Sequence, residues 1–366
     1  MNRVFVHGSG AVSPAGWGVS ALLRTLEEAD PSTGSGRAPI PVQHLERPGR
    51  KQPLRVRRVP VADPRPASFG HARLRRASPI SHYAVAAAQE ALGPDAAFAG
   101  RAERRLGVIL CVMSGCVNYS RRFFDEALRD PATASPLVFP ETVFNAPSSH
   151  LAAVLGTTAI NYTLVGDPAT YLDGLVLAAQ WLSAGLVDGC VVVGAEELDW
   201  LTADAFRLFA RRLVVSEGAG ALYLTGQPQP FSVRDAPGTR NAAAVTLDSV
   251  TDTFIFWNEP ERAAAARAVA TQLLARGQTH LVCDGLQQVP RFDRAEALAW
   301  KDWKGTRRSV KTVLGEGLMA AAAWQCVAAV ELLRAGQHTA AFVPVAGCNA
   351  QVAGARFTTV PEPNSA

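Results

Sequence analysis

One apolar helix limits, more than any other feature, the folds that this sequence can adopt. Residues 169–184 carry little charge and are apolar on nearly every side of a helix, so we expect this helix to be buried all round. Asp167 is predicted to cap its N-terminus, with Pro168 at its first position. A short strand over 159–165 and a buried strand over 188–193 flank it. A helix enclosed in this way predicts a layered α/β protein.

The second half of the chain repeats this pattern. A second apolar, Ala-rich helix is predicted over 317–333, with strands over 279–283, 342–345 and 351–358 around it. We therefore expect a duplicated α/β/α/β/α architecture of five layers. The first half is expected to span residues 1–225, including a loop-rich covering segment over 31–76, and the second half to span residues 226–366.

Composition excludes several classes of protein. Of the 366 residues, 48% are hydrophobic and 19% are charged, which rules out a disordered chain, a coiled coil and a small disulfide scaffold. No apolar run approaches about 18 residues, and the N-terminus lacks the layout of a secretory signal. The expected location is the cytoplasm, with no membrane span. The net charge of +4 is too small to mark a nucleic-acid binder.

Basic residues and cysteines each allow a simple interpretation. Ten basic residues and one acid lie between Arg47 and Arg76, which predicts either a solvated loop or a docking face for an acidic partner. None of the six cysteines forms a Cys-x-x-Cys pair, and no histidine has zinc-finger spacing, so no metal site is expected. Four cysteines lie in apolar runs and should be buried and inert: Cys111, Cys190, Cys283 and Cys326.

Six short segments occur in the order in which a known family carries them. Residues 6–16 read VHGSGAVSPAG, residues 217–221 read EGAGA and residues 347–350 read GCNA. The other three segments are 75–88, 135–146 and 188–196. The ordered set, spread over residues 4–357, resembles the β-ketoacyl synthases. This resemblance implies the thiolase fold, which is usually dimeric.

A ketosynthase condenses an acyl thioester with a malonyl thioester, and the resemblance implies three reacting side chains. A Cys at the start of the buried helix supplies a thiolate whose pKa the helix dipole lowers, and two His residues stabilise the enolate. Pro168 stands at the Cys position, and Asp284 and Glu316 stand at the His positions. Only the family's Lys remains, as Lys311, and we expect it to pair with Glu316. No replacement catalytic set is found.

The start of the buried helix is more similar to that of chain length factors, the partner subunits of type II polyketide ketosynthases, which lack the Cys. Their helix commonly begins with an acid followed by Gln-Ala-Gly-Gly-Leu-Asp-Ala-Leu, and this chain reads Asp-Pro-Ala-Thr-Tyr-Leu-Asp-Gly-Leu over 167–175. In some relatives the Gln supports decarboxylation, but Pro168 has no hydrogen-bond donor. The resemblance implies a non-catalytic subunit that pairs with an active β-ketoacyl synthase in type II polyketide, aryl polyene or fatty-acid-like biosynthesis. The acyl chain would be carried on the phosphopantetheine of an acyl carrier protein, with no cofactor bound directly.

The same resemblance places this chain at the far end of the active subunit's acyl tunnel. The strand over 159–165 would pair with the partner's equivalent. The candidate tunnel residues are Met113, Val117, Tyr119, Phe123, Phe124, Leu137, Val138, Phe139 and Phe144. Core packing is the simpler expectation for most of them. Arg73, Arg75 and Arg76 would attract the acidic carrier protein by electrostatic steering.

Two other functions remain open. One is a thiolase-fold enzyme with an altered active site, such as a decarboxylase or hydrolase. The other is a self-associating scaffold that keeps only the fold. A sealed pocket and a symmetric homodimer would favour the scaffold, whereas neighbouring genes for a Cys-containing ketosynthase and an acyl carrier protein would favour the chain length factor.

Overall fold

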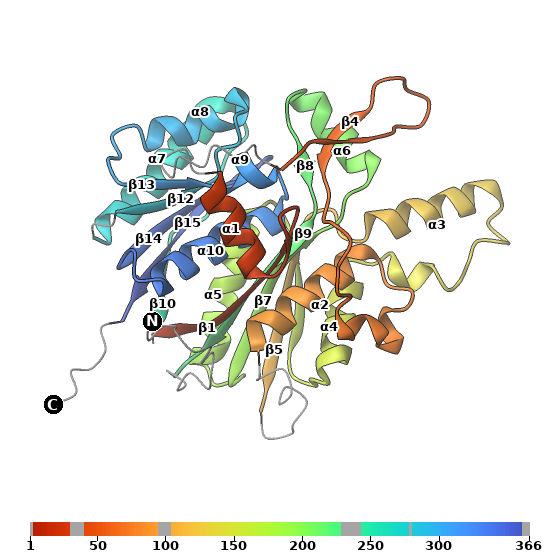
Figure 1. Cartoon of the computed structure of the whole chain (residues 1–366), viewed down its shortest axis with the longest axis horizontal. Coiled ribbons are helices and arrows are strands. Elements are labelled where there is room, and N and C mark those ends of the chain that lie inside the picture. Colours follow the sequence, from red (N-terminus) through yellow and green to blue (C-terminus); the bar gives the residue numbers. More distant parts are fainter. Residues whose placement is uncertain (1–2, 30–39, 94–103, 228–242, 278–279, 361–366) are drawn as a thin grey trace.

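The fold is dominated by one large mixed sheet with helices on both faces (Figure 1). The computed structural model describes residues 3–29, 40–93, 104–227, 243–277 and 280–360. The strands are β1 (Val4–Ser13), β2 (Gly16–Trp17), β3 (Gln43–Leu45), β4 (Leu54–Arg57), β5 (Leu106–Val112), β6 (Asn161–Val165), β7 (Gly189–Glu196), β8 (Val215–Ser216), β9 (Gly218–Thr225), β10 (Val245–Val250), β11 (Phe254–Ile255), β12 (Leu281–Asp284), β13 (Thr306–Ser309), β14 (Ala340–Ala346) and β15 (Gln351–Thr359). The helices are α1 (Val19–Glu28), α2 (Pro79–Leu92), α3 (Val117–Arg129), α4 (Ala146–Leu155), α5 (Thr170–Ser183), α6 (Trp200–Phe209), α7 (Glu259–Ala275), α8 (Pro290–Ala299), α9 (Val310–Leu314) and α10 (Met319–Arg334).

The sheet consists of two halves with the same strand order. The first half runs β6-β5-β7-β9-β1 and the second runs β13-β12-β14-β15-β10, so each has the order 3-2-4-5-1 in its own chain numbering. In each half the fifth strand is antiparallel to its neighbours, while the others that pair are parallel. The halves meet where Val4–Val6 of β1 pairs antiparallel with 245–247 of β10. The predicted duplication is therefore confirmed.

Helix α10 occupies the centre of the molecule. It packs on β1, β7 and β9 of the first half and on β12 and β14 of the second (Figure 1). Its alanines allow the strands to approach closely: a Cβ on Gly220 of β9 would lie only 2.6 Å from the Cβ of Ala323. Trp324 crosses this layer, and its indole N–H reaches the carbonyls of Val12 (3.1 Å) and Ala219 (2.9 Å). Burial on both sides is what the apolar sequence of this helix predicts.

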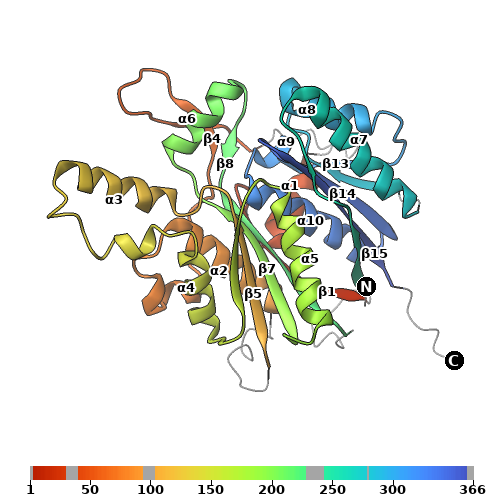
Figure 2. The same cartoon turned by 180° about the vertical axis from the view of Figure 1, so that it is seen from behind.

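Helix α5 shares the central layer with α10, and two outer helical layers complete the five-layered arrangement. Helix α5 lies beside α10 and packs on β5 and β7, as Figure 2 shows from behind. Helices α2 and α4 cover the outer face of the first half, and α7, with α8 packed on it, covers the second. The expectation that α5 is buried all round is wrong for one face. Asp173, Val176 and Leu177 are only half-buried and Gln180 is exposed, because the described part of the chain covers this face only in part, as where the Thr253 hydroxyl donates to Asp173 at 2.8 Å.

The segment predicted as a loop-rich cover over 31–76 contains two strands. β3 and β4 pair with each other, and β4 continues in parallel onto β8, because Leu54 and Val56 point into a small core of their own. Arg47 and Arg57 are also buried rather than solvated. Arg47 pairs with Asp204, and Arg57 donates to two backbone carbonyls.

Other boundaries differ from the sequence expectation. Pro140 and the small residues after it predict a helix over 140–155, but the helix begins only at Ala146, because Pro147 lacks an N–H and fits only in the first turn of a helix. Helices α1, α6 and α8 and strand β13 were not predicted. The boundary expected after residue 225 falls at the end of β9, beside residues 228–242, which lie outside the described residues, and it stays a prediction. None of the described helices combines the length and the apolar character that a membrane crossing requires.

Candidate functional site

The start of α5 is held against a loop from the second half of the chain. Asp167 does not cap the helix as predicted; Ala169 occupies the cap position. The Asp167 carboxylate instead accepts the backbone N–H groups of residues 349–351 at 3.1–3.3 Å. A Cβ on Gly347 would lie 1.7 Å from Asp167 Oδ2, so only glycine permits this approach. The prediction fails because these N–H groups come from a segment distant in the sequence, between β14 and β15.

No nucleophile stands at the first turn of α5. Pro168 is buried and has no reactive side-chain atom. The Thr170 hydroxyl donates to Gln351 Oε1 at 2.9 Å, so it is already engaged in a structural hydrogen bond. Burial raises the pKa of Asp167, and the three N–H groups only partly oppose this. The helix start is therefore a packed junction, and we call it, together with Asp284, Lys311 and Glu316, the α5 site.

The predicted ion pair between Lys311 and Glu316 is confirmed. Lys311 Nζ lies 2.8 Å from Glu316 Oε2, and both side chains are almost completely buried. The other carboxylate oxygen, Oε1, accepts the backbone N–H of Leu318 at 2.9 Å. Burial is the largest single influence and lowers the pKa of Lys311, but the charge and hydrogen bond of Glu316, together with smaller contributions from Cys348 and Glu296, outweigh it, so the net pKa is raised. The ammonium group is thus held charged and turned toward its own carboxylate.

Two further acids lie beside this pair. Asp284 ends β12 and is fully buried, with Oδ2 3.3 Å from Arg307 Nε but without the alignment of a hydrogen bond. Glu296 of α8 accepts the backbone N–H of Gly285 at 2.9 Å. Burial, and then the charge of Asp284, raise the pKa of Glu296 to about 8. Sequence reasoning missed Glu296 because nothing distinguishes it from a surface residue of an amphipathic helix.

The structure therefore brings together the three positions where the family's reacting side chains are replaced and the one where its Lys is retained. These are Pro168, Asp284, Glu316 and Lys311. A Cβ on Gly285 would lie 3.1 Å from Glu296 Oε2 and 3.7 Å from Lys311 Cε, which links Asp284 to the ion pair. The charge of Glu316 also acts on Asp167, the neighbour of Pro168. Of the two remaining cysteines, Cys116 is buried and Cys348 is half-buried, and burial together with the charge of Glu316 raises the pKa of Cys348 well above the ordinary value. The thiol is protonated and a poor nucleophile.

The four cysteines expected to be buried, and His150, lie in surroundings that indicate a structural role. Cys111, Cys190, Cys283 and Cys326 are buried, as expected. His150 is also buried, with Nε2 2.7 Å from Glu141 Oε2. Within the described ranges, no group of three His, Cys, Asp or Glu side chains is placed to hold a metal ion.

The candidate tunnel residues lie mostly at the surface of this chain. Val138 is buried, Phe124 and Leu137 are each 61% exposed, and Phe139 and Phe144 are 55% and 46% exposed. The remaining four are half-buried: Met113, Val117, Tyr119 and Phe123. The Phe123 ring lies beside that of Phe139, with 5.3 Å between the ring centroids. Core packing is therefore wrong for the four exposed residues, because they lie on α3 and in the segment between α3 and α4, which the described part of the chain leaves largely open to solvent. We call these four, with Tyr162 and Val165 of β6, the β6 surface.

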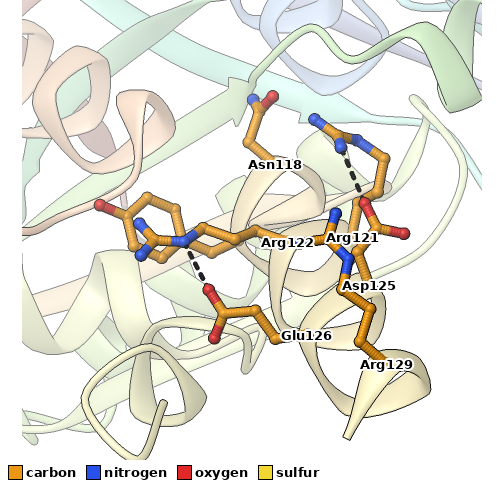
Figure 3. Close-up of a pocket in the computed structure, with 7 residues that line it drawn as sticks. Asn118, Arg121, Arg122, Asp125, Glu126 and Arg129 are labelled. Atoms are coloured by element: carbon orange, nitrogen blue, oxygen red, sulfur yellow. Dashed lines mark hydrogen bonds and ion pairs between the residues drawn. The ribbon is translucent and has the colours of Figure 1, made fainter. Parts of the chain in front are cut away.

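A pocket of about 420 Å³ lies on α3, which projects from the body of the molecule (Figures 1 and 3). Its charges are paired with one another. Arg121 contacts Asp125 at 3.2 Å, and Arg122 contacts Glu126 at 3.0 Å (Figure 3). Arg121 also contacts Asp199, which lies outside the pocket lining, at 2.8 Å. Tyr119 lines this solvent-facing pocket. Such internal pairing leaves few free charges to recognise a ligand.

Arg73, Arg75 and Arg76 lie in and after the short turn η3 (Ala72–Leu74), and all three side chains are exposed. Their position is compatible with docking of an acidic protein. Their role in docking stays a prediction.

Comparisons with known proteins agree with this architecture. The family model described as "Beta-ketoacyl synthase, N-terminal domain" matches residues 1–227. The ishigamide ketosynthase/chain length factor is similar over 98% of this chain and 99% of its own, with a TM-score of 0.78 and 19% identity. A ketosynthase in complex with its chain length factor from Xenorhabdus doucetiae gives a TM-score of 0.72 and 16% identity over 98% of each chain. A type II PKS acyl-carrier protein in complex with its ketosynthase gives 0.73 and 16% over 98% of this chain and 99% of that one. No curated protein matches the sequence.

The buried ion pair gives the first testable prediction. Lys311→Met would leave the Glu316 charge buried and unpaired, and we expect the free energy of unfolding to fall by about 3–5 kcal/mol. Adding Glu316→Gln removes that charge but keeps an acceptor for Leu318, so the double variant should recover most of the loss. Urea unfolding measures both, with exposed Lys51→Met as the control that should not change. A double variant no more stable than the single variant would contradict the assignment.

Glu296 gives a prediction on pH. Its raised pKa means that the folded state holds this proton up to about pH 8, whereas the unfolded chain releases it near the ordinary value of 4.5. Stability contributed by the protonated form is present at pH 4–5 and is lost as the pH rises through 8. Glu296→Gln cannot ionise, so its unfolding free energy relative to wild type should increase from pH 5 to pH 9. Exposed Glu46→Gln is the matched control, and a pH-independent difference for Glu296→Gln would refute the prediction.

Proposed function

This chain belongs to the β-ketoacyl synthase family, and from that premise we propose that it is a non-catalytic subunit, similar to a chain length factor, that pairs with an active β-ketoacyl synthase. The observation that carries the proposal is the α5 site, where Pro168 replaces a nucleophile and a buried ion pair fills the place of a catalytic His. The complex would act in type II polyketide, aryl polyene or fatty-acid-like biosynthesis.

The chemistry of condensation explains why the α5 site is inactive. Acyl transfer requires a thiolate or an activated hydroxyl, and Pro168 offers neither. An enolate requires hydrogen-bond donors aimed at its oxygen. Lys311, the one cation retained from the family pattern, is committed to Glu316 at 2.8 Å. Asp284 would add negative charge beside a developing anion, which raises rather than lowers the barrier.

The β6 surface supports pairing with a second subunit. Tyr162 and Val165 are 53% and 51% exposed, although they lie in the last strand of a large sheet. The half-exposed face of α5 lies next to this strand, which α5 also contacts. Addition of a partner strand to β6 would satisfy its free backbone groups and cover both apolar surfaces. Obligate interfaces of this kind bury more than about 2,000 Å².

The aromatic residues of the β6 surface suggest how an inactive subunit acts on the product. Rings that are not part of this chain's core are free to close the end of an acyl tunnel in the partner. A growing chain that meets a ring in a close-packed wall stops or turns. The substrate would remain on the phosphopantetheine of an acyl carrier protein, which Arg73, Arg75 and Arg76 would attract. This chain itself would need no cofactor.

The alternatives make different demands on the same structure. An altered enzyme would require a new nucleophile or base, and the α5 site offers a neutral Cys348 and an occupied Thr170 instead. A scaffold would share the filled site but would form a symmetric homodimer through β6. The preferred partner therefore separates the scaffold from the chain length factor.

Acylation and partner choice test the proposal directly. We expect the purified chain to acquire no acyl group from acyl or malonyl carrier protein, because it lacks a nucleophile. Co-expression with a Cys-containing ketosynthase should yield a heterodimer in which intact-mass spectrometry finds acyl groups only on the ketosynthase. An acyl adduct on any residue of this chain would disprove the non-catalytic role. A stable homodimer that does not exchange with the ketosynthase would support the scaffold.

Product length tests the tunnel role. In the complex, Tyr119→Ala, Phe123→Ala, Phe139→Ala and Phe144→Ala each remove a ring from the region expected to close the tunnel. We expect at least one variant to lengthen the product by one or more two-carbon units, because the removed ring leaves space for a longer chain. Leu208→Ala, an exposed apolar residue on α6, is the control. If all four variants keep the wild-type product length, or simply unfold in a thermal melt, the assignment fails.

A further inference from the structure

A cavity of about 350 Å³ lies between α6 of the first half and α7 and α8 of the second, outside the β6 surface and next to the loop that binds Asp167 of the α5 site. Figure 1 shows α7 and α8 side by side above the sheet. The loop between β14 and β15 also contributes, through Cys348 and Asn349. Its volume falls at the lower end of the range of small-molecule sites, roughly 300–1,000 Å³. The proposed function uses none of the side chains on its walls.

Aromatic side chains line this cavity at two depths. Trp257 and Phe209 stand at the rim, 83% and 57% exposed. Phe256 and Phe292 lie deeper, and Phe256 is only 5% exposed. Large rings left in solvent beside a concave surface are unusual in a monomer, and aromatic walls favour a flat apolar body.

One charged side chain in the wall lacks a counter-ion. Arg262 of α7 is only 4% exposed, and its Cζ lies 5.1 Å from the Phe256 ring and 5.2 Å from the Phe292 ring. It donates one hydrogen bond, to the Phe292 carbonyl at 3.3 Å, while its Nε–H has no partner. In the part of the chain that the structure describes, no carboxylate forms an ion pair with it. A buried guanidinium that is balanced only by two rings favours a bound anion.

The remaining charges around the cavity set the charge of that anion. Arg291 stacks over Phe209 at 5.9 Å and donates to its carbonyl at 3.0 Å. Glu259, in the first turn of α7, opposes one of the two arginines. The net local charge is then +1, which matches a monoanion such as a carboxylate better than a doubly charged phosphate monoester.

We propose that this cavity binds a small aromatic carboxylate, with its ring against the aromatic walls and its carboxylate at Arg262. The site combines an enclosed volume, exposed rings at its mouth and a buried cation without a counter-ion. Because none of these groups belongs to the α5 site or the β6 surface, the inference stands or falls independently of the proposed function.

Binding of trans-cinnamate, measured by isothermal titration calorimetry, tests this proposal, with the neutral isostere cinnamamide as the matched ligand control. The protein is used as purified, alone or with its synthase partner. We expect cinnamate to bind and to raise the melting temperature, and cinnamamide to bind at least tenfold more weakly. Phenyl phosphate should bind more weakly than cinnamate. No heat with cinnamate at millimolar concentration, equal binding of the amide, or tighter binding of phenyl phosphate would each overturn the assignment.

Three variants locate the site. Arg262→Met keeps the volume of the side chain and removes its charge, and we expect it to weaken cinnamate at least tenfold. Trp257→Ala changes an exposed residue that cannot disturb the core, and it should weaken cinnamate severalfold even if Arg262→Met fails to fold. Arg267→Met makes the same substitution at an exposed position of α7 and should leave binding unchanged. Wild-type affinity in Trp257→Ala and in a folded Arg262→Met, or an equal loss in Arg267→Met, would disprove the site.

Discussion

The enclosure of α10 between the two halves of the large sheet is the constraint on which the rest of the structure depends. A helix buried on all sides needs small side chains wherever a strand crosses it, and Gly220 against Ala323 shows how little space remains. Two five-stranded halves with the same order supply the two sides, and they join at only three residues of β1 and β10. Close-packed layers of this kind deform little, so the loops at the ends of the strands are held in defined places. The α5 site is built from those loops.

The α5 site shows how a catalytic centre is converted into a structural one. Each group that would take part in catalysis is satisfied by another group of the protein. Lys311 pairs with Glu316, Asp167 binds a backbone loop, and the hydroxyl of Thr170 donates to Gln351. Buried charges are costly unless they are paired, so such a network stabilises one arrangement and opposes the entry of water or substrate. Glu296, whose raised pKa keeps it neutral, fits the same arrangement without a counter-ion.

Function can depend on the surfaces where rings, a strand edge or a charged group have no partner within the described chain. The β6 surface exposes rings and an unpaired strand edge, while the cavity at Arg262 exposes rings beside a buried cation. The pocket on α3 is larger, but its charges are already paired, and volume alone therefore does not identify a site (Figure 3). The physical criterion is the same in each case: a group that the chain itself leaves without a partner indicates a partner from outside.

The sequence alone determined the duplicated α/β architecture, because long apolar helices and short apolar strands are local patterns. It also determined the missing side chains, since Pro168, Asp284 and Glu316 can be read directly, and the Lys311–Glu316 pair, which is separated by five residues. Only the tertiary structure decided where Asp167 points, that Glu296 is buried beside Asp284, and that the rings near α3 are exposed rather than in the core. The direction of Asp167 depends on a contact between segments 182 residues apart, and the burial of Glu296 depends on the contact of α8 with the end of β12. The exposure of the rings depends on the lack of a described layer over α3 and the segment after it. None of these contacts produces a periodic pattern in the sequence. They are decided only when the two halves pack around their central helices.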